Sequence, residues 1–152
     1  MTPTRGIPTP PPVPAATAGD RGGPDEPVAT VERITKPWGY EEIFAVLEGG
    51  YVGKTLHIVA GGQLSLQQHL VKDETVAVYS GRIRVDHGPD RAHLQTDTLL
   101  PGHRLRIPPG VLHRISADID SVVLEASTAH PGWRTDINRI EDRYDRRGST
   151  QP

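Results

Sequence analysis

Two short stretches of the sequence carry side chains that could bind a metal ion. Gln67, His69 and Glu74 lie close together in the first stretch, and His113 follows a proline-glycine bend in the second. Imidazole nitrogens, a carboxylate and an amide oxygen form a ligand set that Zn²⁺, Mn²⁺, Fe²⁺ and Ni²⁺ all accept. A divalent ion with open coordination positions acts as a Lewis acid on carbonyl and hydroxyl oxygens. The chemistry indicated is therefore the polarisation of a small oxygen-containing substrate.

The elements that must position these side chains are β-strands. Gln67 and His69 are two residues apart, so a strand points both to the same face. Glu74 lies beyond a charged turn at the start of another predicted strand, and the bend delivers His113 to the head of a third. Four inward-pointing polar side chains are costly to bury unless something satisfies them. We predict that one metal ion does so, although Gln67 could instead hydrogen-bond the strand backbone.

Alternation of apolar and polar residues extends over most of the chain, and glycine and proline separate the alternating segments. Short strands at this spacing predict an all-β sandwich or barrel rather than a βαβ fold. The segment 82–87 is predicted as the hairpin partner of 75–80, and a short helix is predicted over 136–144. The predicted strands are 40–47, 51–60, 64–70, 75–80, 82–87, 105–107, 112–117 and 121–127.

The 152 residues suffice for one domain. The first thirty residues are rich in proline and carry only isolated apolar side chains, which cannot offset the entropy of ordering. We predict a disordered, partly polyproline arm over residues 1–30, a folded domain over 31–146 and a disordered tail over 147–152.

Composition excludes several classes of function. The formal net charge is −2 and there is no long basic run, which argues against a nucleic-acid partner. The absence of cysteine excludes disulfides, thiolate metal sites and cysteine nucleophiles. No apolar run is long enough to span a bilayer, and the N-terminus lacks the apolar region of a secretory signal. These features predict a cytoplasmic protein with no membrane partner.

The two metal-binding stretches resemble the two motifs of the cupin superfamily, G-x5-H-x-H-x3-4-E-x6-G and G-x5-P-x-G-x2-H-x3-N. Gln67 stands in place of the first histidine and Ala117 in place of the asparagine. The resemblance implies a single cupin-type β-barrel (a double-stranded β-helix, or jelly roll), one divalent ion and a homodimer. The positions that match the motifs are Gly61, His69, Glu74, Gly81, Gly102, Pro108, Gly110 and His113.

Within the cupins, the segment Leu64-Ser65-Leu66-Gln67-Gln68-His69 resembles the L-S-L-Q-x-H stretch of phosphomannose isomerases, which type II enzymes carry in a C-terminal cupin domain. Further similarity lies at Lys36-Pro37-Trp38-Gly39, at Lys54 and at Glu141-Asp142-Arg143-Tyr144. The resemblance implies a metal-dependent aldose–ketose isomerase that acts on a sugar phosphate, with zinc as the expected ion. Lys72 stands where the type II enzymes have an arginine, and this change loses bidentate contact geometry.

Several residues are candidates for the remaining roles. Lys54, Lys72, Glu125 and His57 are candidate proton carriers, and Lys54 could point into the barrel or out of it. Arg104 and Arg114, beside the second motif, are candidates to meet a phosphate at the mouth of the barrel. Two alternatives stay open: a non-catalytic metal- or ligand-binding cupin, and another cupin metalloenzyme such as a dioxygenase or a biosynthetic cyclase.

Overall fold

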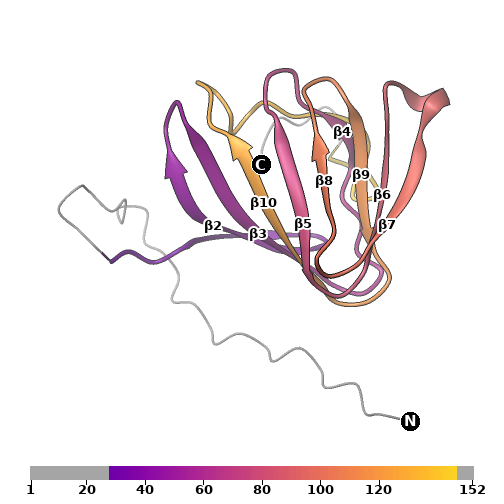
Figure 1. Cartoon of the computed structure of the whole chain (residues 1–152), viewed down its shortest axis with the longest axis horizontal. Coiled ribbons are helices and arrows are strands. Elements are labelled where there is room, and N and C mark those ends of the chain that lie inside the picture. Colours follow the sequence, from indigo (N-terminus) through magenta and orange to yellow (C-terminus); the bar gives the residue numbers. More distant parts are fainter. Residues whose placement is uncertain (1–27, 147–152) are drawn as a thin grey trace, which may run out of the picture.

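The computed structural model of the chain describes residues 28–146, which form two antiparallel β-sheets around a common interior (Figure 1). The six strands of the larger sheet are, in spatial order, β1 (Glu32–Lys36), β2 (Gly39–Leu47), β3 (Tyr51–Ile58), β10 (Ser121–Thr128), β5 (Glu74–Ser80) and β8 (Arg104–Ile107). The five of the smaller sheet are β11 (Asn138–Glu141), β4 (Leu66–Gln68), β9 (Leu112–Ala117), β6 (Ile83–Gly88) and β7 (Gln95–Leu99), and a 3₁₀ turn, η1 (Arg91–His93), precedes β7.

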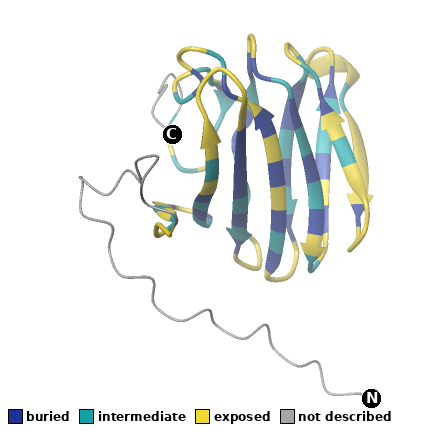
Figure 2. Ribbon diagram, turned by 60° about the vertical axis from the view of Figure 1, so that its left-hand side comes forward, coloured by how far each residue is buried: buried dark blue, intermediate teal, exposed yellow. Residues whose placement is uncertain are grey.

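The alternation seen in the sequence becomes the two faces of each sheet. Buried and exposed residues alternate along the strands in Figure 2. Leu56, Val76 and Val123 from the larger sheet pack against Val85 and Ile115 from the smaller one, each at most 2% exposed. The predicted all-β class is therefore confirmed, and the apolar half of the interior leaves the other half free for polar side chains.

The predicted hairpin between residues 75–80 and 82–87 is wrong. Strand β5 pairs with β10 and β8 in the larger sheet, whereas β6 pairs with β7 and β9 in the smaller one. The chain crosses from one sheet to the other at Gly81, whose φ of +86° is one that other residues rarely adopt. A Cβ there would lie 2.2 Å from the Ser121 hydroxyl oxygen, so the crossing also needs the small residue.

The helix predicted over 136–144 is also wrong, because this segment contains β11. Asn138 pairs with Gln68 and Arg139 with Gln67, so a partner about seventy positions earlier in the chain determines its conformation. Strands β1 and β7 were not predicted either. Both lie at edges of their sheets, where one face or both are exposed and the alternation is weak.

The described residues cover the domain predicted for 31–146. Most of the predicted arm (1–27) and the whole predicted tail (147–152) lie outside the described residues. Within residues 28–146 no helix is long and apolar enough to cross a bilayer.

Candidate functional site

Three strands bring the predicted metal ligands together inside the barrel. Gln67 on β4 lies directly opposite His113 on β9, and Glu74 is the first residue of β5. His69 follows immediately after β4. One nitrogen from each histidine and one oxygen from Glu74 all lie within 4.8 Å of one another, and all three side chains are buried. The structure thus gathers residues from both motifs at one point.

Backbone carbonyls fix the orientation of both imidazole rings. Nδ1 of His113 donates to the Val111 carbonyl at 3.0 Å, and Nδ1 of His69 donates to the Asp136 carbonyl. Each Nε2 is therefore turned toward Glu74, at 3.0 Å for His113 and 3.5 Å for His69. Metal-binding histidines are held in this way, with the second nitrogen hydrogen-bonded to the protein.

One observation from the structure, independent of the sequence motifs, indicates that the cluster fits a divalent ion. Nε2 of His69 is buried and has no hydrogen-bond partner among the described residues. An unsatisfied buried nitrogen is costly, and a bound ion would remove the cost. Burial lowers the pKa of His69 to about 4, assisted by the positive charge of Lys72, which leaves the ring neutral and able to ligate.

The amide of Gln67 adjoins the cluster. Its Oε1 accepts a hydrogen bond from the Ser65 hydroxyl at 2.6 Å, and its Nε2 lies 3.5 Å from Nε2 of His113. A half-turn of the terminal amide would present the oxygen to the same place. Gln67 is therefore positioned as a fourth ligand, and its ligation stays a prediction.

A buried lysine links the cluster to a second carboxylate. The ammonium of Lys72 lies 2.5 Å from Glu74 Oε2 and 3.1 Å from Glu125 Oε1. Burial acts to lower the pKa of Lys72, but the two carboxylates outweigh it and raise the pKa above its usual value. Burial acts to raise the pKa of both carboxyls, and the neighbouring charges, Lys72 above all, hold them below their usual range. All three groups are therefore ionised at neutral pH.

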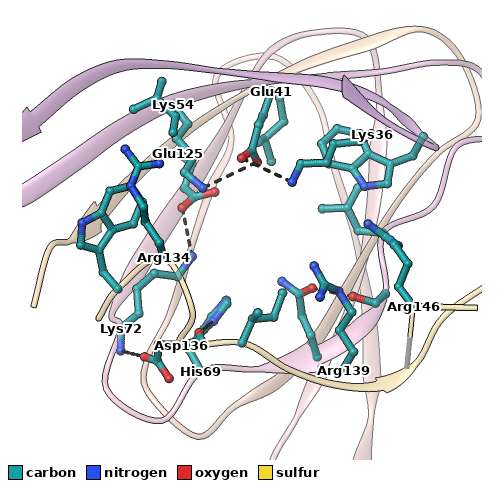
Figure 3. A pocket seen from close by; sticks show the side chains of 18 residues that line it. Lys36, Glu41, Lys54, His69, Lys72, Glu125, Arg134, Asp136, Arg139 and Arg146 are labelled. Atoms are coloured by element: carbon teal, nitrogen blue, oxygen red, sulfur yellow. Dashed lines mark hydrogen bonds and ion pairs between the residues drawn. The ribbon is translucent and has the colours of Figure 1, made fainter. Parts of the chain in front are cut away.

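Through His69 the cluster adjoins a cavity of about 680 Å³, a volume that includes its solvent-filled mouth (Figure 3). Gln67, His69, Lys72 and Glu125 line it, and Trp38 lies in its wall, 3% exposed. Lys54 also points into the barrel and lines the cavity, which answers the question left open by the sequence.

His57, by contrast, does not line the cavity. Side chains along β3 point alternately into the barrel and to its outer face, and His57 is on the outer face. There its ring stacks on Tyr40 and its Nε2 lies 3.2 Å from Glu42 Oε2. Of the four candidate proton carriers, His57 is thus the one that does not line the cavity.

The two arginines predicted at the mouth are also misplaced. Arg114 on β9 lies outside the cavity and pairs with Asp86 at 2.9 Å. Arg104 is exposed on the edge strand β8 and does not line the cavity. Both side chains alternate with inward-facing neighbours, so adjacency in sequence to the second motif does not place them at the mouth.

Other charged residues of the cavity were not singled out in the sequence. Two of them carry a detectable signal, because each keeps the period of an apolar neighbour two positions away: Lys36 with the partly buried Ile34, and Glu41 with the buried Ile43. Charged residues in this register are usually read as solvent-facing, which hid them. The lining residues missed in this way are Lys36, Glu41, Arg134, Asp136, Arg139 and Arg146.

No protein-family model and no curated protein matches the chain. Solved structures, by contrast, do match the chain. The capsular polysaccharide assembling protein CapF from Staphylococcus aureus is 16% identical with a TM-score of 0.65 over 76% of this chain and 35% of that chain. Oxalate decarboxylase from Bacillus subtilis is 16% identical with a TM-score of 0.64 over 72% of this chain and 30% of that chain. KdgF from Halomonas sp. is 20% identical with a TM-score of 0.54, covering 62% and 81% of the two chains.

This chain spans about a third of the length of the CapF and oxalate decarboxylase chains. At 16–20% identity, what the three structures share with this chain is the fold. The described residues therefore adopt the cupin fold.

Proposed function

We propose that the chain is a metal-dependent isomerase that interconverts an aldose and a ketose, acting on a small polyhydroxylated substrate such as a sugar phosphate. The observation that carries the proposal is that His69, which belongs to the His69–Glu74–His113 cluster, and an ionised carboxylate, Glu125, line one cavity. Isomerisation requires both a Lewis acid and a base on the same substrate. Zinc is the expected ion, and the ligands also suit manganese, iron or nickel.

A divalent ion held by His69, Glu74 and His113, with Gln67 as a fourth ligand, would polarise adjacent substrate oxygens. Glu125 then has the role of base. Its carboxylate would take the proton from the hydroxyl-bearing carbon and return it to the former carbonyl carbon. The hydroxyl proton passes to the former carbonyl oxygen, so the product is an isomer with no atom gained or lost.

Lys72 would act on Glu125 rather than on the substrate. Its ammonium stabilises the ionised carboxylate at 3.1 Å and also holds one oxygen of Glu74. The other Glu74 oxygen faces His113 and would be the one to hold the ion. Lys72 is thus a positioning residue in this proposal.

The test has two stages. Elemental analysis of the purified protein should find about one divalent ion per chain, with most of it lost in His69→Ala and His113→Ala. The metal-loaded protein is then assayed for isomerisation across a panel of sugar phosphates. Bound iron together with oxygen uptake would point to an oxygenase instead.

A matched pair of variants tests the base. Glu125→Gln should keep the ion and lower kcat by about 10²-fold or more. Glu42→Gln changes a glutamate on the outer face of the larger sheet and should leave kcat unchanged. Equal kcat in the two variants would remove Glu125 from the mechanism.

A second candidate is a cupin that binds a ligand without turnover. The contact that favours it is the 2.5 Å approach of the Lys72 ammonium to Glu74, since this cation competes with a metal ion for the carboxylate. It predicts a metal content far below one ion per chain and ligand binding with no product on the panel.

A further inference from the structure

Positive charge predominates on the cavity wall. Among the described residues that line it, six side chains are cationic and three carry carboxylates. Charges in a partly dry cavity are costly unless they are paired. The cations are Lys36, Lys54, Lys72, Arg134, Arg139 and Arg146, and the carboxylates are Glu41, Glu125 and Asp136.

Three of these cations make close contacts with carboxylates. Lys72 lies between Glu74 and Glu125, as described above. Arg146 makes a two-pronged contact with Asp142 at 2.8 and 2.9 Å. Arg134 pairs with Glu32 at 3.1 Å and stacks over Trp133. Lys36 and Lys54, by contrast, are grouped around a single carboxylate, Glu41.

Two buried lysines share that one carboxylate. The ammonium groups of Lys36 and Lys54 each lie 3.6 Å from a different oxygen of Glu41, too far for a short ionic hydrogen bond. Glu41 Oε1 has no hydrogen-bond partner among the described residues. Lys36, Glu41 and Lys54 are 8%, 5% and 9% exposed. In Figure 3 both ammonium groups are directed toward the open centre of the cavity.

A third cation approaches from the smaller sheet. The guanidinium of Arg139 on β11 lies across the cavity from the lysines in Figure 3, near enough to interact electrostatically with Lys36 and Glu41. Arg139 is paired in register with Gln67, so this cation lies directly opposite a predicted metal ligand on the neighbouring strand. Lys36, Lys54 and Arg139 therefore line the same cavity as the predicted ligands Gln67 and His69.

We infer that Lys36, Lys54 and Arg139 form a subsite for a terminal anionic group of the substrate, either a phosphate or a carboxylate. This inference rests on the proposed function. The substrate then lies with its anionic end at the lysines and its carbonyl and hydroxyl oxygens at the metal cluster. Lys54 binds this group and does not carry protons. An anion here would supply the missing negative charge and the short contacts that Glu41 does not make.

The protonation of Lys36 agrees with this assignment. Burial lowers the pKa of Lys36, with smaller effects from Lys54 and Arg139, while Glu41 acts in the opposite direction. A bound anion would raise this pKa again, so binding should be strongest where Lys36 is charged.

The experiment measures anion affinity rather than turnover. Inorganic phosphate and acetate are titrated separately into the metal-loaded protein by calorimetry. Lys36→Gln and Lys54→Gln should each weaken the preferred anion by about tenfold, the loss of one charge-assisted contact. Lys36→Arg retains the charge and should retain binding, which separates loss of the cation from a folding defect. Arg84→Gln removes an exposed arginine of the smaller sheet and is the control.

The two anions distinguish the substrate classes. Tighter binding of phosphate assigns a phosphorylated substrate, and tighter binding of acetate assigns a sugar acid. Unchanged affinity in both lysine variants overturns the subsite. Binding that disappears in His69→Ala but survives in Lys36→Gln also overturns it, because the anion then sits on the metal.

The two proposals fail in different ways. Lysine-dependent anion binding with no product on the isomerisation panel would leave the subsite standing and remove the isomerase. Turnover without lysine-dependent anion binding would leave the isomerase standing and remove the subsite.

Discussion

Asp136 supports the candidate metal site from two directions. Its backbone carbonyl accepts from His69, and its carboxylate accepts from the backbone amides of Leu70, Val71 and Lys72 at 2.8–3.0 Å. The residue therefore fixes both a predicted ligand and the loop that leads to Glu74.

Replacing Asp136 should consequently affect metal affinity as well as stability. Asp136→Ala is expected to cost about 2 kcal/mol in unfolding free energy, since three amides lose their acceptor. Metal affinity should fall by about tenfold or more, as for other supporting groups around metal ligands. Denaturant titration and metal competition measure the two effects.

Asp120→Ala is the matched control for this change. Asp120 also accepts from a backbone amide, that of Ala60, but lies away from the metal cluster. It should lose stability without losing metal affinity. Equal metal affinity in the two variants would show that Asp136 stabilises the fold alone.

Lys36 carries a cost in stability that follows from its burial. Its pKa in the folded chain is lowered from 10.5, mainly by burial, so the unfolded chain binds the proton more tightly. Between the two pKa values the stability of the fold therefore rises with pH, and the full cost is present below both of them.

Lys36→Met should accordingly stabilise the protein at pH 7, by about 1 kcal/mol, because an apolar side chain of similar length replaces a buried charge. The gain should shrink as the pH approaches 10.5. Urea unfolding at pH 7 and pH 10 checks both statements, with Lys36→Arg as the variant that keeps the charge. A loss of stability at pH 7 would contradict the argument.

For single residues, the sequence was most informative where side chains that can bind a metal are spaced two apart, as on one face of a strand. Gln67 and His69 share a face because they are two apart, and this needs no knowledge of the fold. The neighbours Glu41 and Glu42 show the opposite case. One points into the cavity and the other to the outer face, and only the pairing of β2 with β1 and β3 decides which.

Among the elements, the entry into β2 is the most constrained. Gly39 has a φ of +141°, and a Cβ on it would lie 1.9 Å from the His57 carbonyl oxygen. The adjacent Trp38 is buried in the main core. The pairing of β2 with β3 therefore depends on a residue without a side chain at this position.

Gly39→Ala should destabilise the fold by about 3 kcal/mol, through both backbone strain and the clash with β3. Gly49→Ala is the comparison, because Gly49 has a φ of +76° with open space around it. That change should cost only about 1 kcal/mol, the backbone contribution alone. Thermal unfolding of the two variants separates the clash from the backbone preference, and equal losses would show that β3 yields to the added Cβ.

Strands in the centre of each sheet were predicted from their alternation, whereas three of the four edge strands, β1, β7 and β11, were not. Strands β10 and β5 bury one face completely, so their pattern is clear. Strand β11 is short and forms because β4 offers it hydrogen bonds, a long-range cause that no local pattern records. The error matters, since β11 carries Arg139 into the cavity.

For the molecule as a whole, the homodimer expected from the cupin resemblance stays a prediction. The larger sheet carries exposed apolar side chains at Phe44, Tyr79 and Leu124, which are 55%, 71% and 38% exposed. Apolar groups gathered on one sheet are typical of surfaces that bind a partner.

We expect gel filtration with light scattering to give twice the mass of one chain. Tyr79→Lys combined with Leu124→Lys should shift the protein to a monomer, because two buried charges would face each other across the two-fold axis. His103→Lys, at an exposed position near the β7–β8 turn, is the control. A wild-type monomer would exclude the dimer, and a dimeric double variant would move the interface elsewhere.

The hydrogen bond between His69 and the Asp136 carbonyl affects the order in which the site assembles during synthesis. Ribosomal synthesis releases β4, β5 and β9 well before residue 136, so all four predicted ligands emerge while the carbonyl that orients His69 is still missing. Strand β11, which closes the cavity beside Gln67, emerges later still. The predicted metal site is therefore complete only after residue 136 has emerged, and a nascent chain that stops at Thr128 has all four predicted ligands without the carbonyl that orients His69.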